Sequence, residues 1–430
     1  MNAVTVVGAG LAGSEAAYQL AIRGIPVRLI EMKPKKMTPA HVSPYFAELV
    51  CSNSLRSDEL TNAVGLLKEE LRRLGSIVMR CADEHHVAAG GALDREGFAR
   101  AVTEAVRALP NVEIVEEEAV DIPDGEVIIA SGPLTSDALA ENILRRTGSE
   151  GLHFYDAVAP IVSLDSVDME SAFRASRYDK GTADYVNCPM TEEEYTAFWK
   201  ELTTAREAAV HGFDDGGVFE GCMPVEVMAR RGFDTLRYGP MKPVGLRDPH
   251  TGHEPYAVVQ LRQDNADGTL YNLVGFQTHL AFPEQRLREA EFVRYGVMHR
   301  NTYLQSPGKL DRYYRLIAEP RIAFAGQITG VEGYVESCAS GMLASLEMAA
   351  RLLGLQPVDF SQETAIGALG LYISHGSIGD FQPMNINFGI ISPLTYRVKG
   401  KRNKNAEISA RSLAQIDELV KGDLWNAYTH

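Results

Sequence analysis

A glycine-rich turn between an apolar strand and an amphipathic helix constrains the fold more than any other feature of the sequence. Residues 4–7 read Val-Thr-Val-Val, and Gly8, Gly10 and Gly13 follow at the spacing GxGxxG. The first glycine allows the tight turn, the second lets a pyrophosphate approach the backbone, and the third lets the helix pack closely on the strand. The pattern predicts a parallel α/β domain that binds a dinucleotide at the N-terminus of a helix.

The second predicted strand ends in an acidic residue. Residues 27–31 read Val-Arg-Leu-Ile-Glu, and a carboxylate at this position can accept hydrogen bonds from ribose hydroxyl groups. Strand, helix and acidic residue all accompany the glycines, so dinucleotide binding is favoured over a plain α/β turn without a ligand. The residues predicted to bind the dinucleotide here are Gly8, Ala9, Gly10, Leu11, Ala12, Gly13 and Glu31.

Two later segments favour FAD over NAD as the tightly bound dinucleotide. Residues 127–132 read Val-Ile-Ile-Ala-Ser-Gly, and residues 324–330 read Phe-Ala-Gly-Gln-Ile-Thr-Gly. Both resemble the short strand-then-glycine segments of FAD-binding proteins that contain two dinucleotide folds. Because no second clear glycine fingerprint follows, NAD(P)H is expected to bind transiently, as a reductant. These segments add four residues to the predicted cofactor site: Gly132, Gly326, Gln327 and Gly330.

Strand and helix signals alternate at both ends of the chain but not in its middle. Residues 256–262 and 270–278 instead predict a hairpin around the turn sequence Asp-Asn-Ala-Asp-Gly. The predicted fold class is α/β, with an FAD-binding Rossmann-like domain split by an inserted α+β domain. Residues 1–155 and 301–430 are the predicted parts of the FAD-binding domain, and residues 156–300 are the predicted insertion.

Apolar periodicity also predicts individual helices. The spacing of leucine, valine and phenylalanine side chains indicates helices over 60–74, 94–109 and 191–210. The first helix is expected to begin with Leu60 in its buried stripe. Between two short strands, the acidic residues of 116–124 are expected to form a solvated turn.

The overall charge limits the classes of partner. The chain has 42 basic and 57 acidic residues, a net charge of −15, which argues against a general nucleic-acid coat because phosphate binding depends mostly on Lys and Arg. Residues 228–247 and 397–411 are nevertheless locally basic. No apolar run approaches the ~18 residues of a membrane span, and no signal peptide is recognisable. A cytoplasmic protein without membrane contact is therefore expected.

Cysteine and histidine spacing gives no sign of a metal site. The five cysteines include no CxxC pair, so neither a zinc ribbon nor a disulfide framework is predicted. The pairs His85-His86 and His250–His253 lack a third ligand nearby in the sequence, and no metal is expected.

Longer motifs carry a resemblance to a known family. Residues 48–56 (ELVCSNSLR), 219–224 (FEGCMP), 237–243 (RYGPMKP), 274–278 (VGFQT) and 324–337 resemble those of the folate- and FAD-dependent tRNA (uracil-5-)-methyltransferases. The resemblance extends over nearly the whole chain. The last motif also resembles the larger flavoprotein that helps to install carboxymethylaminomethyl groups on wobble uridine, and an rRNA-directed branch of the methyltransferases is an alternative.

The resemblance implies a reaction with three participants. Methylenetetrahydrofolate supplies the one-carbon unit, FADH2 regenerated by NAD(P)H supplies the electrons, and C5 of the T-loop uridine of tRNA accepts the methyl group. Uracil C5 is a poor nucleophile until a thiolate adds to C6, so the site needs a reactive thiol and a proton acceptor. Cys222 is the predicted nucleophile and Cys51 its partner in proton transfer, with the swapped roles left open. Cys81, Cys188 and Cys338 are expected to be packing groups.

The remaining substrate contacts are assigned to loops and charged stretches. The loop 381–388 is a candidate for folate binding, since its amides can bond a pterin and its phenylalanine can stack; an ordinary capping loop is the alternative. Tyr238 and Tyr396 lie among or beside the basic stretches and can stack on bases. The residues predicted to bind tRNA are Arg230, Arg231, Lys401, Arg402 and Lys404.

Two other classes of function are alternatives to the methyltransferase. A small-molecule FAD/NAD(P)H oxidoreductase would need no uracil-directed thiol and no basic stretches. A non-catalytic flavoprotein that binds RNA would not depend on its cysteines. The route of the methylene group, through the flavin or directly, is left open, and either route needs folate close to the isoalloxazine.

Overall fold

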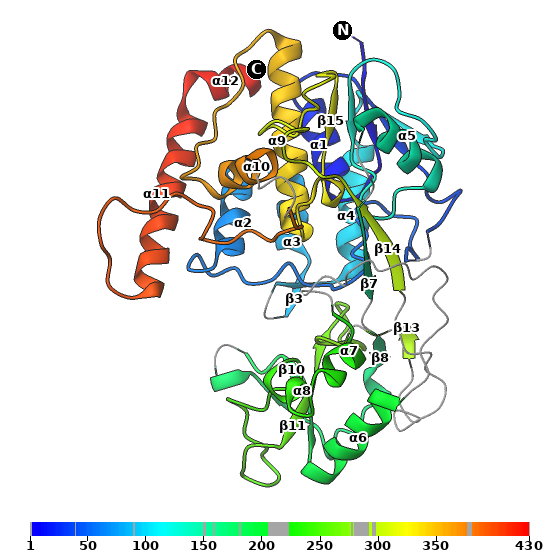
Figure 1. The fold of residues 1–430 in the computed structure, drawn as a ribbon, viewed down its shortest axis with the longest axis vertical. Helices are drawn as coiled ribbons and strands as arrows, with labels where there is room; N and C mark the ends of the chain where they lie inside the picture. The colour runs from blue at the N-terminus through cyan, green and yellow to red at the C-terminus, as the bar shows by residue number, and fades with distance from the viewer. Residues whose placement is uncertain are drawn as a thin grey trace.

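The computed structural model describes residues 2–38, 40–88, 91–148, 152–157, 160–179, 182–204, 223–276, 278, 292–294, 298–375 and 381–429. Two larger sheets organise this part of the chain (Figure 1). The described residues within 2–148 and 304–429 surround a parallel sheet and are called the parallel-sheet region. Those within 160–294 surround an antiparallel sheet and are called the insertion region.

The parallel sheet has five strands in the order β15-β6-β1-β2-β5. Strand β1 is central: Val4 pairs with Val27 of β2, and Thr5 pairs with Val127 of β6. Its side chains are buried on both faces, as expected for a parallel strand covered by helices on both sides. Strand β15 brings residues from beyond the insertion back to the sheet edge. The strand bounds are β1 Val4–Val7, β2 Val27–Glu31, β5 Val112–Glu116, β6 Val127–Ile129 and β15 Ile322–Phe324.

Two helices from opposite ends of the chain form the centre of this region. Helix α1 (Leu11–Ala21) packs along α9 (Tyr334–Leu353), and a Cβ on Gly341 would lie 2.2 Å from the carbonyl oxygen of Ala12. Only glycine allows this approach, which places the start of α9 beside the glycine-rich turn. The other helices of the region are α2 Ala63–Arg73, α3 Ile77–Glu84, α4 Arg95–Arg107, α5 Asp137–Thr147, α10 Ala365–His375, α11 Lys401–Lys421 and α12 Asp423–Thr429.

The predicted helices of the first 150 residues correspond to α2 and α4. One detail was wrong: Leu60 lies before α2 and is exposed, so it is not part of the buried stripe. Within the described ranges, no helix combines the length and the apolar character needed to cross a bilayer.

The insertion region is built on an antiparallel sheet in the order β13-β8-β12-β11-β10-β9. Strands β11 and β12 form the predicted hairpin, with Leu261 opposite Leu273. A separate core that includes Tyr195 and Leu236 lies between this sheet and its helices. The elements are β8 Ile161–Ser163, β9 Phe173–Ala175, β10 Tyr185–Met190, α6 Glu192–Thr204, α7 Val225–Arg230, α8 Thr235–Tyr238, β11 Ala257–Gln263, β12 Leu270–Leu273 and β13 Phe292–Arg294.

A two-stranded ribbon joins the two regions. Strands β7 (Leu152–Ala157) and β14 (Met298–Tyr303) run antiparallel and extend from one region towards the other in Figure 1. Both predicted domain boundaries, 155/156 and 300/301, fall within this ribbon and stay predictions. A parallel-sheet α/β fold interrupted by an α+β insertion is confirmed. A separate two-stranded hairpin is formed by β3 (His86–Ala88) and β4 (Ala92–Leu93).

Candidate functional site

The glycine-rich turn is shaped by two close backbone approaches and one open space. Gly8 has φ +95°, and a Cβ there would lie 2.6 Å from the carbonyl oxygen of Ala130; a Cβ on Gly13 would lie 1.8 Å from the carbonyl oxygen of Gly8. Gly10 has no atom within 4 Å of its Cβ position and caps the N-terminus of α1. Two of these glycines are therefore required by packing, while the third leaves room for an anionic group at the helix N-terminus.

Glu31 ends β2 beside this turn and is buried. One carboxylate oxygen accepts the backbone N–H of Ala9 at 2.7 Å, and the other accepts the N–H of Lys33 at 3.0 Å. The side chain thus connects the glycine-rich turn to the end of the next strand. It stands where a ribose hydroxyl of a dinucleotide can also reach it.

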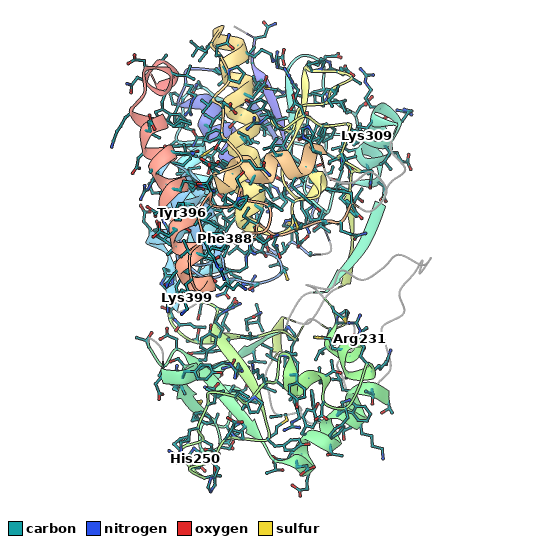
Figure 2. All side chains as sticks on the ribbon, turned by 60° about the vertical axis from the view of Figure 1, so that its left-hand side comes forward. Arg231, His250, Lys309, Phe388, Tyr396 and Lys399 are labelled. Atoms are coloured by element: carbon teal, nitrogen blue, oxygen red, sulfur yellow. The ribbon has the colours of Figure 1, made fainter. Side chains whose placement is uncertain are left out.

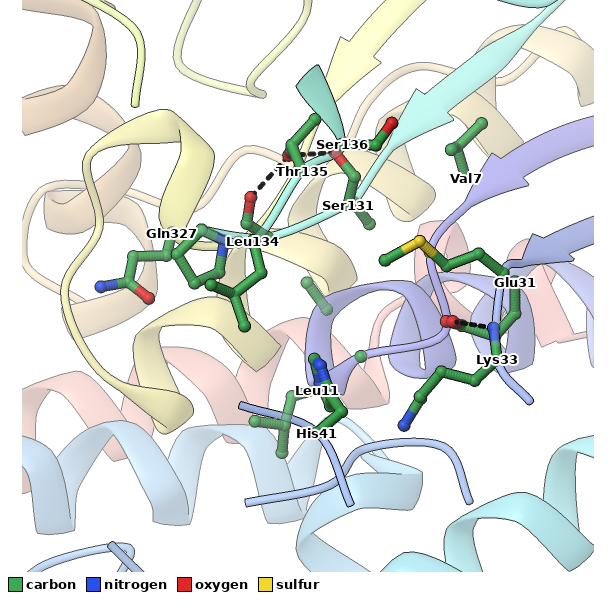
Figure 3. Close-up of a pocket in the computed structure, with 18 of the residues that line it drawn as sticks. Val7, Leu11, Glu31, Lys33, His41, Ser131, Leu134, Thr135, Ser136 and Gln327 are labelled. Atoms are coloured by element: carbon green, nitrogen blue, oxygen red, sulfur yellow. Dashed lines mark hydrogen bonds between the residues drawn. The ribbon is translucent and has the colours of Figure 1, made fainter. Parts of the chain in front are cut away.

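A pocket opens along the carboxyl ends of the parallel strands (Figure 3). Its empty volume, which includes space open to solvent, is about 1060 Å³. Such a crevice at the carboxyl edge of a parallel sheet is the usual place for a bound ligand in this class of fold. Several of the predicted cofactor residues lie in its wall: Gly8, Gly10, Leu11, Ala12, Glu31, Gly132, Gly326 and Gln327.

Three predicted cofactor residues are not in the wall but support it. Ala9 donates its N–H to Glu31, and Gly13 lets α1 approach the turn. Gly330 has φ +85°, and a Cβ there would lie 2.4 Å from the ring of Phe381. These residues shape the pocket through the backbone.

The structure adds pocket residues that the sequence pattern did not indicate. Lys33 and Glu48 form a buried ion pair with 3.5 Å between Nζ and Oε2, and both line the pocket together with His41. Figure 3 labels Lys33 and His41 among the residues that line the pocket. Glu117 and Glu118, expected only as part of a solvated turn, also line it. Of these residues, only Lys33 could have been suspected from the sequence, because it follows just after a predicted strand. The places of the other residues in the pocket wall depend on tertiary contacts.

Cys51 lies at the edge of this pocket. Its backbone N–H donates to the hydroxyl oxygen of Tyr334 at 2.9 Å, and both Tyr334 and the preceding residue Val50 line the pocket. The cysteine is half-buried. Cys222, the other predicted catalytic cysteine, lies outside the described residues. The structure therefore places the backbone of one predicted catalytic cysteine beside two residues of the pocket wall.

The other described cysteines are poor nucleophiles by their surroundings. Burial raises the pKa of Cys81 to about 11 and that of Cys188 to about 11. Burial also raises the pKa of Cys338 well above its ordinary value, and its thiol lies 3.4 Å from the carboxylate of Glu15, whose charge adds to the effect. A thiol that stays protonated at neutral pH neither attacks carbon nor accepts a proton readily. Among the described residues, no group of three or more histidine, cysteine, aspartate or glutamate side chains is arranged to hold a metal ion.

The predicted RNA-binding residues occupy two exposed surfaces. Arg230 and Arg231 end α7 in the insertion region, and Lys401, Arg402 and Lys404 begin α11 in the parallel-sheet region; all five are exposed. Figure 2 labels Arg231 in the insertion region and Lys399, two residues before α11, in the parallel-sheet region. The two residues lie on the sides of the regions that face each other.

Arg237, within the first basic stretch, is used structurally. Its guanidinium lies 3.6 Å from the ring centroid of Tyr256 and donates to Asp234 at 2.8 Å. The next residue, Tyr238, is instead 82% exposed. Arg237 therefore contributes to the insertion core, while Tyr238 is available at the surface.

The candidate folate loop 381–388 packs on the segment before α9 but contributes no residue to the pocket wall described above. Phe381 is buried against Gly330 and Tyr372, so Phe388, which is half-buried, is the phenylalanine with a surface left for stacking. The side chain of Asn385 donates to the carbonyl oxygen of Glu332 at 2.6 Å. Folate binding by this loop stays a prediction.

Comparisons with known proteins cover most of the chain. A family model described as "Glucose inhibited division protein A" matches residues 3–356. The "Methylenetetrahydrofolate--tRNA-(uracil-5-)-methyltransferase TrmFO" of Acetivibrio thermocellus is 57% identical over 428 residues, which is 97% of this chain and 98% of that protein. The protein of the same name from Ligilactobacillus salivarius is 55% identical over 426 residues, again 97% of this chain and 98% of the relative.

Solved structures show the same fold at low identity. Two crystal forms of Aquifex aeolicus GidA superpose with TM-scores of 0.68 and 0.69 at 14% and 16% identity. The superpositions cover 98% and 99% of this chain, and 74% and 77% of the GidA chain. They confirm the Rossmann-type fold with its insertion.

Proposed function

Because the chain belongs to the Glucose inhibited division protein A family and, within it, to the methylenetetrahydrofolate--tRNA-(uracil-5-)-methyltransferases, we propose that it methylates C5 of the T-loop uridine of tRNA. The one-carbon unit comes from methylenetetrahydrofolate and the electrons from FADH2, which NAD(P)H regenerates. The reaction belongs to the cytoplasm, where tRNA is modified. The observation that carries the proposal is the contact of Cys51 with Tyr334 in the wall of the pocket.

The donor set of the pocket fits FAD. The open space at Gly10 and the N-terminus of α1 suit a pyrophosphate, and the carboxylate of Glu31 suits a ribose hydroxyl. We assign FAD to this pocket, held by the glycine-rich turn, Glu31, Gly132 and the segment 326–327. Bound and reduced, FAD supplies the electrons that convert a methylene into a methyl group.

The two predicted thiols divide the work on uracil. The thiolate of Cys222 adds to C6, which makes C5 nucleophilic towards the methylene carbon. Cys51 then accepts the proton from C5, and the bond between the methylene carbon and the folate nitrogen breaks to release tetrahydrofolate. A hydride that bound FADH2 would supply reduces the methylene to a methyl group, and the bond between C6 and the sulfur of Cys222 breaks to release the thiolate. The hydrogen bond from the Cys51 N–H to Tyr334 holds this segment against the pocket. The swapped assignment of the two cysteines is the alternative.

The tRNA footprint follows from exposed positive charge. The start of α11 places three cations within four residues, and the end of α7 adds two from the insertion region. Tyr238 and Tyr396 are 82% and 58% exposed and can stack on unpaired bases. The support is that the labelled residues Lys399 and Arg231, next to these two surfaces, lie on the sides of the two regions that face each other in Figure 2.

The test is direct. The yellow holoprotein is incubated with an unmodified tRNA transcript, methylenetetrahydrofolate and NAD(P)H, and the nucleosides are analysed by mass spectrometry for 5-methyluridine. The variants C51A and C222A are expected to lose at least about a hundredfold in rate, whereas C81A, a matched control at a buried thiol, keeps its activity. Oxidation of NAD(P)H without 5-methyluridine would indicate an oxidoreductase, and product only in rRNA would indicate the other RNA substrate.

A trapping experiment separates the roles of the two thiols. RNA that contains 5-fluorouracil cannot lose a proton from C5, so the adduct with the nucleophile persists. C222A is expected to form no adduct, while C51A still forms it. The reverse result assigns the nucleophile to Cys51.

A further inference from the structure

The segment that carries Cys51 is held from both sides. On the side of the parallel-sheet region, the Cys51 N–H donates to Tyr334 at 2.9 Å and the buried Asn53 side chain donates to the carbonyl oxygen of Leu93 at 2.9 Å. On the other side, the same Asn53 side chain donates to the carbonyl oxygen of Gln263 in β11 at 2.8 Å. The segment is thus a joint between the pocket and the insertion region.

Arg262 of β11 makes two further contacts to this segment. Its Nη2 donates to the hydroxyl oxygen of Ser52 at 2.6 Å, and its Nε donates to the side-chain oxygen of Asn53 at 3.1 Å. The residue is only 9% exposed. A buried guanidinium costs free energy unless its donors are satisfied, so the two residues after Cys51 serve as neutral acceptors for this charge.

An ion pair close to Arg262 in the sequence also links the Cys51 segment to the insertion region. Asp264, two residues further along, accepts the Nε of Arg95 at 2.8 Å and 2.9 Å, with both side chains largely buried. Arg95 in turn donates to the carbonyl oxygen of Cys51 at 3.3 Å. The peptide groups of Cys51 are therefore linked to the pocket through Tyr334 and to the insertion region through Arg95 and Asp264.

We propose that Arg262 is a positioning residue, which sets the Cys51 thiol relative to the insertion region by holding Ser52 and Asn53. This rests on the proposed function, in which Cys51 and Cys222, whose sequence position falls within the predicted insertion 156–300, act on one uracil ring. Two thiols can act on neighbouring carbons of one ring only if their relative placement is held to within a fraction of an ångström. Arg262 is suited to this because its planar fork donates in fixed directions.

The test compares R262Q with R177Q. Arg177 lies in the same region and donates to Gln260 of the same strand at 2.8 Å, but its hydrogen bonds go to Gln260 and Val244 and not to residues 51–53. We expect R262Q to lower kcat at least about tenfold with the KM for tRNA and the FAD content nearly unchanged, R262K to recover part of the loss, and R177Q to stay near wild type. Equal losses in R262Q and R177Q, or a change confined to KM, would overturn the proposal.

A second measurement does not depend on turnover. The rate at which iodoacetamide alkylates Cys51 in the holoprotein, followed by peptide mass spectrometry, should change at least about fivefold in R262Q and in the milder S52A, while the rate at buried Cys81 stays constant. An unchanged rate at Cys51 in both variants would contradict the positioning role even if the wild-type protein made no 5-methyluridine. If the wild-type protein made no 5-methyluridine but the alkylation rate changed in the variants, the proposed function would be rejected. The role of Arg262 in positioning Cys51 would still stand.

Discussion

Glu31 shows how much one carboxylate does at the residue scale. It accepts two backbone N–H groups, from Ala9 in the glycine-rich turn and from Lys33 after β2. The side chain therefore fixes the glycine-rich turn against the end of β2. The same residue serves the fold and the proposed cofactor site.

The substitution E31Q is expected to weaken FAD binding about tenfold or more. The glutamine NH2 would face a backbone N–H, and a hydrogen bond to a charged group contributes about 1.5–3 kcal/mol. Titration of the apoprotein with FAD, followed by flavin fluorescence, measures the Kd. The matched control is E116Q, since Glu116 pairs with Glu31 in register but forms a surface ion pair with Arg107 at 3.0 Å. Equal Kd values for the two variants would be inconsistent with the assigned role.

At the scale of elements, the β1–α1 turn separates packing from ligand binding. Gly13 touches the backbone of Gly8, whereas Gly10 faces open space in the pocket. The two glycines look alike in the sequence pattern, but their substitution should have different consequences.

G13A is expected to destabilise the apoprotein, and G10A is expected to weaken FAD binding. A Cβ on Gly13 would lie 1.8 Å from the Gly8 oxygen, and overpacking of this kind costs about 1–3 kcal/mol or more. G10A should change the free energy of unfolding of the apoprotein by less than about 0.5 kcal/mol while it raises the Kd for FAD at least about tenfold. Urea unfolding and flavin titration of both variants check this; the opposite pattern would reverse the assignment of the two glycines.

A buried carboxylate also joins three helices. Glu70 of α2 accepts the N–H groups of Ala365 and Ile366 at the start of α10, at 2.7 Å and 2.8 Å, and the hydroxyl of Ser412 in α11. Burial raises the pKa of Glu70 from its ordinary value to about 7, against the lowering effect of these hydrogen bonds. Helix α11, whose first residues include Lys401, Arg402 and Lys404, is therefore connected to the core through the carboxyl group of Glu70.

Stability should fall with pH because of Glu70. Its folded pKa of about 7 lies above the ordinary value of 4.5, so its stabilising contribution is complete below about pH 4.5, is lost as pH rises to about 7, and is constant above. The free energy of unfolding of the wild type minus that of E70Q should fall by a few kcal/mol over this interval. Urea unfolding at several pH values measures it, and a difference that rises with pH would refute the argument.

At the scale of the whole molecule, charge is segregated. The chain carries a net charge of −15, yet the start of α11 and the end of α7 present exposed cations on two regions of the fold. Local positive potential can attract a polyanion to a protein of negative overall charge, because salt screens charges beyond about 10 Å.

We expect the triple variant K401E/R402E/K404E to bind tRNA at least about tenfold more weakly. The slope of log K against log[salt] should also become shallower, by about 0.7–0.9 for each phosphate that the variant no longer neutralises. Filter binding over a range of salt concentrations measures both quantities. The control reverses three exposed cations elsewhere: Arg100, Arg145 and Lys421. Similar binding by both triple variants would remove this patch from the footprint.

Much of the site was predictable where one short stretch of chain determines the geometry. The turn from β1 to α1, the acidic end of β2 and the β11–β12 hairpin depend on backbone conformations that their own residues impose. The structural use of Arg237 could not be predicted, because its stacking on Tyr256 depends on how α8 meets β11. Glu117 and Glu118 were assigned to solvent because nothing local indicates that β5 ends at the pocket.

The sequence by itself determined the Rossmann-type turn, the acidic residue at the end of β2 and the motifs of the methyltransferase family, since each is encoded within a few consecutive residues. Only the tertiary structure decided which residues hold Cys51. Tyr334 lies 283 positions from it along the chain, and Arg262 lies 210 positions from Ser52. Contacts at such separations follow from the packing of whole elements, here α9 on α1 and β11 against the Cys51 segment, which no local pattern specifies.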